Sequence, residues 1–115
     1  MIIDPLQGEI WIVALDLVIG HEQAKTRPCL VISDDRLNRS NAGLVIVMPL
    51  TSQDKRIPWH VQLNPPEGGL RKVSYIMCEQ ARVVSKERLS REPLGTIPDE
   101  ALLAVKARIK FLFNL

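Results

Sequence analysis

The stretch LVIVMPL, residues 44–50, has no polar side chain on either face that a β-strand would present. Because side chains alternate between the two faces of a strand, this pattern indicates a strand that is buried on both sides. Proline cannot donate a hydrogen bond to a sheet, so Pro49 is expected to mark the end of this strand or an edge of the sheet. IWIVAL (10–15) and CLVIS (29–33) are largely apolar in the same way, and we expect buried strands there too.

Polar and apolar side chains alternate in WHVQL, residues 59–63, which predicts a half-buried strand. In this pattern His60 lies on the outer, solvated face. Both tryptophans, Trp11 and Trp59, are expected to be core or rim aromatics, and a tryptophan near a cleft can also stack on a nucleobase. A turn and two more strands follow in the order PPEGGL (65–70), VSYIMC (73–78) and ARVVS (81–85).

The last part of the chain has the periodicity of a helix. In DEALLAVKARIKFLFNL, residues 99–115, the apolar residues at helical spacing are Leu102, Val105, Ile109 and Leu112. Pro98 suits the first turn of this helix, with Thr96 or Ile97 as its cap. The two acidic residues that open the stretch oppose the positive end of the helix dipole. The sequence therefore predicts a mainly β fold, a small and strongly bent β-barrel with one C-terminal α-helix.

Length and composition indicate one globular domain over residues 1–115. Apolar residues make up 46% and charged residues 24%, which is typical of a chain that folds around its own core. The net charge of +2 neither requires nor excludes a nucleic-acid partner. Basic residues in the polar connections form either a phosphate-binding face or a solvated surface. These residues are Arg36, Arg39, Lys55, Arg56, Arg71 and Lys72.

The sequence also indicates where the protein acts. The opening MIIDPLQGEI lacks the basic segment and apolar core of a secretory signal, and no apolar run approaches the roughly 18 residues of a membrane span. We therefore expect a cytoplasmic protein with no membrane partner. Cys29 and Cys78 lie in apolar runs without metal-ligand spacing, so we expect buried free thiols.

One loop carries an unusual concentration of polar side chains. GHEQAKTRPCLVIS, residues 20–33, leaves one expected buried strand and enters the next. Its polar residues are His21, Glu22, Gln23, Lys25, Thr26 and Arg27. Loops held by a rigid scaffold are where binding and catalytic groups tend to lie. Pro28 restricts the backbone of Arg27, which helps to aim the guanidinium from this loop.

Two further polar clusters interrupt apolar runs. They are Thr51, Ser52, Lys55 and Arg56 in MPLTSQDKR, and Glu79, Gln80 and Arg82 in CEQAR. Polar residues between strands need hydrogen-bonding partners, because burying them alone costs about 1–3 kcal/mol. Each cluster on its own therefore also has a structural interpretation, in which its side chains fix the loop, organise the barrel or make a dimer contact.

Taken in order, these segments resemble the MazF/PemK family of bacterial toxin endoribonucleases, the toxins of type II toxin–antitoxin pairs. The matching segments are GEIWIVALD, GHEQAKTRPCLVIS, NRS, VMPLTS, GGL, CEQARVV and the closing helix. They run from about Gly8 to the last helix, and GHEQ is similar to the PemK branch in particular. The resemblance implies an SH3-like barrel, a homodimer, and sequence-selective, metal-independent cleavage of single-stranded RNA, often mRNA, with no cofactor.

The resemblance also implies a reaction and its catalytic residues. In the family, the ribose 2′-hydroxyl attacks the adjacent phosphate and leaves a 2′,3′-cyclic phosphate and a 5′-hydroxyl end. This reaction needs a base, an acid, and positive charge or donors on the phosphoryl oxygens. Arg27 matches the family's essential arginine, and Thr51 its essential threonine. The base is His21, which titrates near neutral pH, or Glu22, and the PemK branch favours His21.

The same resemblance implies contacts to RNA and a protein partner. The expected RNA-binding residues are Gln23, Lys25, Thr26, Ser52, Lys55, Arg56, Arg71, Lys72, Glu79, Gln80 and Arg82. The connections 54–58 and 65–72 are expected to read the bases. The partner is an antitoxin, expected to be a small, acidic, partly disordered chain that folds over the RNA groove and competes with substrate.

The sequence departs from the PemK branch at one place. That branch carries an arginine two positions before an aspartate, where this sequence has Met77 and Glu79. The carboxylate is kept but is longer, and the arginine is absent. Arg27 is therefore expected to carry more of the phosphate charge, or Arg82 or Lys72 to assist.

Two other functions stay open at this point. The same barrel serves CcdB-type gyrase poisons, which bind a protein and catalyse nothing, although such a protein has no need of the Arg27 and Thr51 pair. A barrel that binds an antitoxin but has lost activity is the other alternative, and the change at Met77 is compatible with it.

Overall fold

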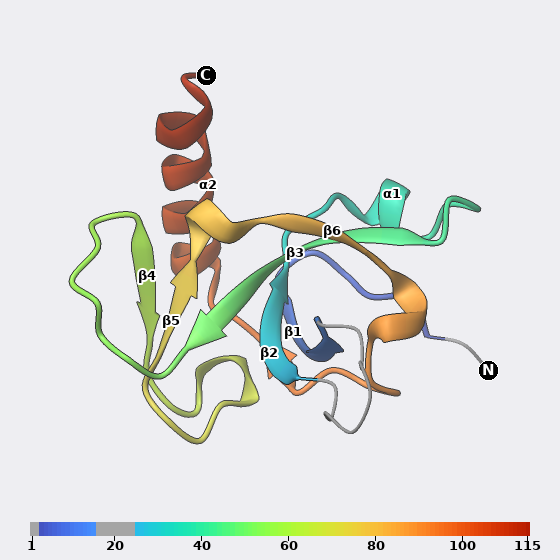
Figure 1. Cartoon of the computed structure of the whole chain (residues 1–115), viewed down its shortest axis with the longest axis horizontal. Coiled ribbons are helices and arrows are strands. Elements are labelled where there is room, and N and C mark those ends of the chain that lie inside the picture. The colour runs from blue at the N-terminus through green and yellow to red at the C-terminus, as the bar shows by residue number, and fades with distance from the viewer. Residues whose placement is uncertain (1–2, 16–24) are drawn as a thin grey trace.

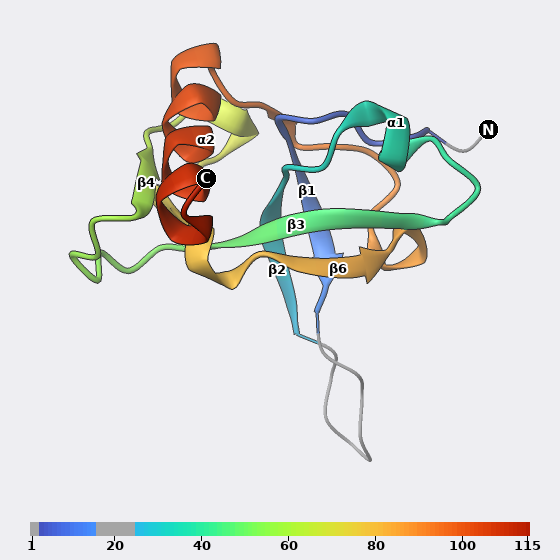
Figure 2. The ribbon, with the colours of Figure 1, turned by 90° about the horizontal axis from the view of Figure 1, so that it is seen from above.

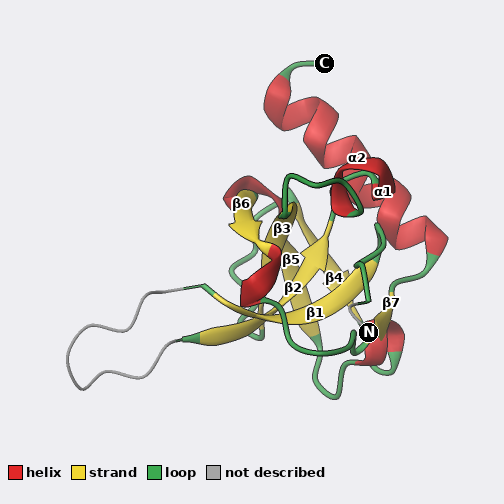
Figure 3. Cartoon of the chain, turned by 90° about the vertical axis from the view of Figure 1, so that its right-hand side faces the viewer, coloured by secondary structure: helices red, strands yellow, loops and turns green. Residues whose placement is uncertain are grey.

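The computed structural model describes residues 3–15 and 25–115. Its main element is a seven-stranded antiparallel sheet that curls into a half-barrel (Figure 1, Figure 3). The strands are β1 (Glu9–Ala14), β2 (Thr26–Val31), β3 (Leu44–Thr51), β4 (His60–Leu63), β5 (Ser74–Met77), β6 (Arg82–Ser85) and β7 (Gly95–Thr96). The helices are α1 (Asp35–Asn38) and α2 (Asp99–Phe113), with single turns η1 (Glu67–Gly69), η2 (Cys78–Gln80) and η3 (Lys86–Arg88). The mainly β fold with a C-terminal helix confirms the predicted class.

Strand β3 is the centre of the sheet because it pairs with three other strands. Along one edge it pairs with β2, as far as Pro49 opposite Cys29. Along the other edge it pairs first with β6, from Leu44 to Val47, and then with β5, from Leu50 onward. Figure 2 shows β6 running beside β3. Pro49 therefore lies inside the strand, where the partner on the second edge changes, and the expectation that it ends the strand or marks a sheet edge was wrong.

Strand β2 begins at Thr26, earlier than the apolar pattern predicted. Thr26 pairs with Ala14, and Arg27 pairs with Val13. The ladder with β1 therefore extends the strand through polar residues, because backbone hydrogen bonds do not depend on side-chain polarity. Arg27 lies on a strand of the sheet, and the expectation that it lies in the loop was wrong.

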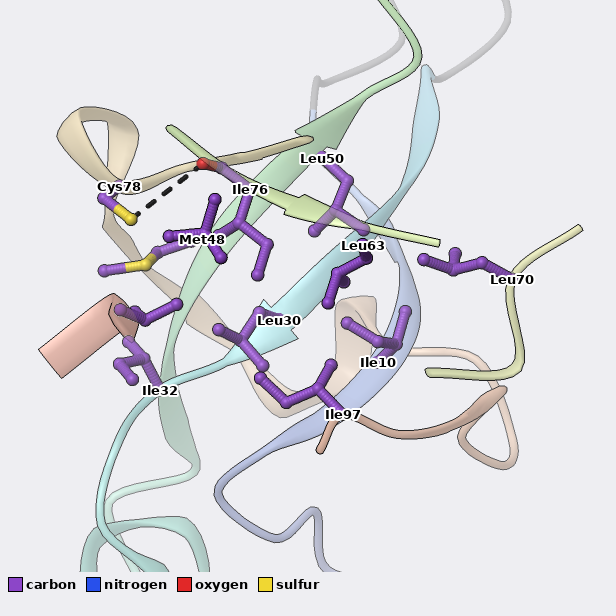
Figure 4. Close-up of a cluster of buried hydrophobic side chains, with 12 residues drawn as sticks. Ile10, Leu30, Ile32, Met48, Leu50, Leu63, Leu70, Ile76, Cys78 and Ile97 are labelled. Carbon is purple, nitrogen blue, oxygen red and sulfur yellow. Dashed lines mark hydrogen bonds between the residues drawn. The ribbon is translucent and has the colours of Figure 1, made fainter. Parts of the chain in front are cut away.

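Two clusters of buried apolar side chains lie on opposite faces of the sheet. Figure 4 shows the first cluster, in which strands on several sides contribute Ile10, Leu30, Met48 and Ile76. The second cluster consists of Trp11, Val13, Cys29, Val31, Val45, Val47 and Val84. Neighbours along a strand enter different clusters because their side chains alternate. Each large side chain that is fully buried contributes about 1.5–3 kcal/mol. These strands are therefore buried on both sides, as their sequences predicted.

Helix α2 packs against the first cluster with the face that its spacing predicted. The packing residues are Leu102, Val105, Ile109 and Leu112. The helix begins at Asp99, and Pro98 is its N-cap, with φ −62° and ψ 151°. Because this backbone is extended, Pro98 stands outside the helix, and the expectation of Thr96 or Ile97 as the cap was wrong.

The C-terminal end of α2 projects beyond the sheet (Figure 1, Figure 3). Phe111 on this end stacks with Trp59, at a centroid distance of 6.2 Å and an interplanar angle of 24°. Trp59 is half-buried and Trp11 is 1% exposed, so they are the rim and core aromatics that were expected. Within residues 3–15 and 25–115, no helix combines the length and apolar character needed to cross a membrane.

Glycines permit a close backbone contact between η1 and β7. A Cβ atom on Gly69 would overlap the Leu94 carbonyl oxygen, and one on Gly95 would lie 2.7 Å from the Gly68 carbonyl carbon. Gly69 also has a φ of 73°, a left-handed conformation that glycine adopts without steric cost. The predicted turn over 65–70 is thus held against the strand that closes this side of the half-barrel.

Gly69→Ala is expected to lower the free energy of unfolding by about 3 kcal/mol or more, because the backbones of η1 and β7 must separate. Gly43→Ala is the matched control, since Gly43 has a φ of 68° but no atom within 4 Å of the added Cβ. That variant should lose only about 1–2 kcal/mol from the left-handed conformation. Urea unfolding followed by circular dichroism measures both, and equal losses would contradict the close contact.

Candidate nucleic-acid interface

The two residues expected to be essential, Arg27 and Thr51, lie at the ends of neighbouring strands. The β2–β3 register ends with Cys29 opposite Pro49. Continued by two residues, it brings Arg27 level with Thr51, at the place where the two strands diverge (Figure 1). Because side chains alternate along each strand, both residues belong to the sheet face that carries Cys29. Residues from two separate polar clusters of the sequence are thus carried by neighbouring strands at one end of the sheet.

Thr51 continues a row of side chains that crosses the sheet. Thr51 pairs with Tyr75 on β5, and Tyr75 pairs with Gln62 on β4. Directly paired residues of antiparallel strands share a face, with Cβ atoms about 4.5–5.5 Å apart. We call Arg27, Thr51, Tyr75 and Gln62 the polar row. Arg27 and Gln62 are exposed, and Thr51 and Tyr75 are half-buried, so the row is open to solvent.

The Thr51 hydroxyl accepts a hydrogen bond from the backbone of the chain that follows it. Its Oγ1 accepts a hydrogen bond from the Gln53 N–H at 3.2 Å. A hydroxyl that accepts from the backbone still has its own proton to donate. The proton of Thr51 is therefore available for an oxygen of a bound phosphate.

A second arginine, Arg82, lies on the sheet face that carries Cys29, because it pairs with Val47 of the second cluster. Burial raises the pKa of the Cys29 thiol to about 12, and the positive charges of Arg27 and Arg82 act against that rise. Arg82 opens β6 and lies opposite Val47 on β3. Val47 is also the partner of Val31 on β2, so Arg82 is level with Val31 and lies further along the sheet than Arg27. The expectation that Arg82 assists Arg27 stays a prediction.

A hollow of about 680 Å³ adjoins the row. Thr51 and Ser52 line one part of it, and Arg71 and Lys72 line another. Pro28 also contributes to the lining, from the sheet face opposite to that of Arg27. Basic and hydroxyl side chains at a rim suit phosphate oxygens, and apolar lining suits a nucleobase. The hollow thus gathers predicted contacts from two segments of the sequence, 51–52 and 71–72.

His60 is not the solvated surface residue that the sequence predicted. Its side chain is 3% exposed, and its Nε2 lies 2.9 Å from one carboxylate oxygen of Glu79 and 3.0 Å from the other. His60 pairs with Met77 across the β4–β5 ladder, and η2 then carries Glu79 over the imidazole. The prediction was wrong because alternation within one strand does not reveal which later element covers its outer face.

The remaining predicted contacts are exposed. Lys25 and Thr26 adjoin Arg27, and Gln80 closes η2. Lys55 and Arg56 lie in the connection between β3 and β4, where the Arg56 N–H donates to the Asp54 carboxylate at 2.9 Å.

Residues His21, Glu22 and Gln23 lie outside the described residues. The described chain beside them is held by Arg88, whose Nη1 donates to the carbonyl oxygens of Ala14 at 3.3 Å and Leu15 at 3.1 Å. This role of Arg88 was not predicted, because nothing in its own segment signals a contact with the chain at Ala14 and Leu15.

Comparison with known proteins shows the family to which the chain belongs. A family model described as PemK-like, MazF-like toxin of type II toxin–antitoxin system matches residues 6–113. The chain belongs to this family. Endoribonuclease MazF9 of Mycobacterium tuberculosis is 34% identical over 114 residues, which cover 95% of this chain and 96% of MazF9. Endoribonuclease PemK of Escherichia coli is 31% identical over 114 residues, which cover 96% of this chain and 84% of PemK.

Solved structures of the MazF family share the fold. MazF in a MazE–MazF crystal structure from Deinococcus radiodurans matches with a TM-score of 0.83 at 28% identity, over 98% of each chain. A crystal structure of MazF alone from the same organism gives a TM-score of 0.81 at 26% identity, over 98% of this chain and 99% of that chain. The resemblance seen in the sequence and the predicted barrel fold are confirmed.

Met77, which stands where the PemK branch has an arginine, lies beside a contact between His60 and Glu79. Met77 is 1% exposed, so a side chain at this position is covered by its surroundings. The residue opposite it on β4 is His60, which bonds Glu79. This member of the MazF/PemK family therefore sets an imidazole against the carboxylate at 79. The sequence signal for this pair was weak, because the two residues stand in separate segments.

Neither thiol is expected to react in the folded protein. Cys29 and Cys78 are free and buried, as predicted. Burial raises their pKa values to about 12 and about 11, so at about pH 8 the reactive thiolate is scarce in both. Reaction with Ellman's reagent should be slow for the native protein, rise only as the pH approaches these values, and be complete in guanidinium chloride. Rapid labelling of the native protein near pH 8 would contradict the burial of these thiols.

Proposed function

We propose that this chain is a sequence-specific endoribonuclease, the toxin of a type II toxin–antitoxin system, acting as one domain over residues 1–115. The observation that carries the proposal is that neighbouring strands carry Arg27 and Thr51 at one end of the same sheet face. Family membership supports it, because the relatives include proteins named as endoribonucleases. Cleavage of mRNA would block translation and growth, and would take place in the cytoplasm.

The proposed reaction is an intramolecular transesterification. The ribose 2′-oxygen loses its proton and attacks phosphorus, and the bond from phosphorus to the 5′-oxygen breaks. The products are a 2′,3′-cyclic phosphate and a 5′-hydroxyl, so the proton lost by one oxygen is matched by the proton gained by the other. All atoms of the new bonds come from RNA, and the protein supplies proton transfer and charge.

Arg27 and Thr51 have different roles at the phosphate. A guanidinium stays protonated and forks onto two oxygens, so Arg27 stabilises the charge that develops in the transition state. The Thr51 hydroxyl donates to a phosphoryl oxygen. Arg27 also has the protons to supply to the leaving 5′-oxygen. The base is His21 or Glu22, on the connection that leads into β2.

The remaining contacts are proposed to position RNA along the face. Arg82 and Lys72 share the phosphate charge with Arg27, which compensates for the missing arginine at Met77. The other proposed RNA contacts are Gln23, Lys25, Thr26, Ser52, Lys55, Arg56, Arg71, Glu79 and Gln80. Phosphate contacts set register and affinity, and base contacts select the sequence.

A protein partner is proposed from the same relatives. One related structure is a MazE–MazF complex, and another is described as an endoribonuclease in complex with its cognate antitoxin. We expect this chain to form a homodimer and to be inhibited by an acidic antitoxin. Such a chain would compete with RNA for the basic side chains around the polar row.

The proposal predicts cleavage of a long single-stranded RNA by the purified protein in EDTA. Arg27→Ala should lower the rate by about 10²–10³-fold, because a preorganised donor to the developing charge is lost. Mapping the ends of the fragments tests the chemistry, which requires cyclic phosphate on one side and a free 5′-hydroxyl on the other. The same map gives the sequence motif.

Arg39→Ala is the matched control, since Arg39 is an exposed arginine that follows α1, outside the proposed site. It should cleave like the unmodified protein. Absence of cleavage by folded, antitoxin-free protein would overturn the proposal. A gyrase supercoiling assay and an antitoxin-binding assay would then separate the two binding-only alternatives.

Arg82→Ala tests whether Arg82 contacts a phosphate of the bound RNA. Binding to an RNA with a 2′-deoxy nucleotide at the cleavage position should weaken by a similar factor for different sequences. The slope of log affinity against log salt should fall by about 0.7, the value for one phosphate contact on a single strand. Fluorescence anisotropy at several salt concentrations measures both, with Arg39→Ala again as control. An unchanged slope would show that Arg82 contacts no phosphate.

A further inference from the structure

The polar row includes an aromatic side chain that the proposed reaction does not use. Tyr75 is the single tyrosine of the sequence. It lies between Thr51 and Gln62 in consecutive pairs of the β3–β5–β4 ladders. It is half-buried and belongs to neither of the two buried clusters. Its neighbours in the row are polar on both sides, so packing in the core does not account for an aromatic ring here.

We propose that the Tyr75 ring is the stacking platform for a nucleobase next to the phosphate that Thr51 contacts. The inference rests on the proposed endoribonuclease function and adds to it a specific base contact. Single-stranded RNA exposes its bases, and aromatic side chains bind them through the ring face. A base adjacent to a phosphate held at Thr51 lies within the reach of the neighbouring side chain in the row.

The geometry favours Tyr75 over the other half-buried aromatic side chain. The Trp59 ring faces Phe111, with which it stacks, so one face of Trp59 is already occupied by the helix. Trp59 also belongs to the sheet face that packs against α2, because it lies two positions before Val61 of the first cluster. Tyr75 lies on the opposite face, which it shares with Thr51.

The two flanking side chains suit such a platform. The Thr51 hydroxyl is oriented by the Gln53 N–H, as described above. On the other side, the Gln62 amide donates to Asn64 at 2.9 Å, which orders the amide at the edge of the row. A stacked base would therefore have a fixed hydroxyl at one border and an ordered amide at the other.

The test uses a short RNA that contains the mapped cleavage motif, with a 2′-deoxy nucleotide in place of the one whose hydroxyl attacks. Binding is then measured without cleavage, by fluorescence anisotropy. Tyr75→Leu keeps the apolar bulk but loses the ring face, and should bind about 10-fold more weakly, within the range for loss of one stacked base. Tyr75→Phe keeps the ring and should bind within about 2-fold of the unmodified protein.

An abasic scan assigns the effect to one base. Each base of the RNA is removed in turn, and every RNA is measured with the unmodified protein and with Tyr75→Leu. At the stacked position the two losses should not add, because the base and the ring remove the same contact. At the other positions the losses should add. Full affinity of Tyr75→Leu, or losses that add at every position, would overturn the inference.

Two controls keep the result tied to stacking. Phe111→Ala removes a ring that is 70% exposed on α2, away from the row, and should bind RNA like the unmodified protein. If Tyr75→Leu proves unstable by thermal unfolding, Tyr75→Val replaces it, since valine favours strands. Failure of the unmodified protein to cleave or bind RNA would overturn the proposed function and this inference together. Cleavage without any effect at Tyr75 would overturn the inference alone.

Discussion

The structure depends on the pairing of β3 with three partners. On one edge β3 holds β2, and on the other it holds β6 and then β5. The change of partner at Pro49 lets one strand belong to both parts of the curled sheet. The last residue of β3, Thr51, is positioned by its pairing with Tyr75 on β5. The candidate site is therefore built at the end of a strand that three partners hold in place.

Burial and charge compete at the end of the sheet that carries Arg27. Burial alone disfavours a thiolate at Cys29, and the guanidiniums of Arg27 and Arg82 favour one. The pKa is raised to about 12, so burial has the larger effect. The Cys29 thiol beneath the arginines therefore stays uncharged and does not neutralise them.

The sequence predicted the parts of this protein that depend on local pattern. The apolar runs around Ile10, Leu30 and Val47 are strands, and the spacing of Val105 and its neighbours is that of the closing helix. The strands and the helix were predictable because hydrophobic periodicity is a property of single segments. The resemblance of the ordered motifs predicted essential roles for Arg27 and Thr51, and these roles stay predictions.

Features that depend on the partner of a strand were not predictable in the same way. The start of β2 at Thr26 follows from its ladder with β1, and the burial of His60 follows from η2, which carries Glu79 over it. Tyr75 gains its place only through the β3–β5–β4 register. The polar residues of the sequence alone do not show which residues of different strands lie side by side. The pairing of the strands shows where β2 begins, what lies near His60 and where Tyr75 lies.

The strands also fix the distances between the side chains of the polar row. Hydrogen-bonded strands lie about 4.8 Å apart, so the step from Thr51 to Tyr75 and on to Gln62 is determined by the backbone. Replacing one of these side chains changes the chemistry at its position but leaves the interval to the next position unchanged. The sheet thus fixes the spacing of the positions, and the side chain at each position can vary. Under the proposal for Tyr75, a substitution at that position would change the contact with the base and leave its distance from Thr51 unchanged.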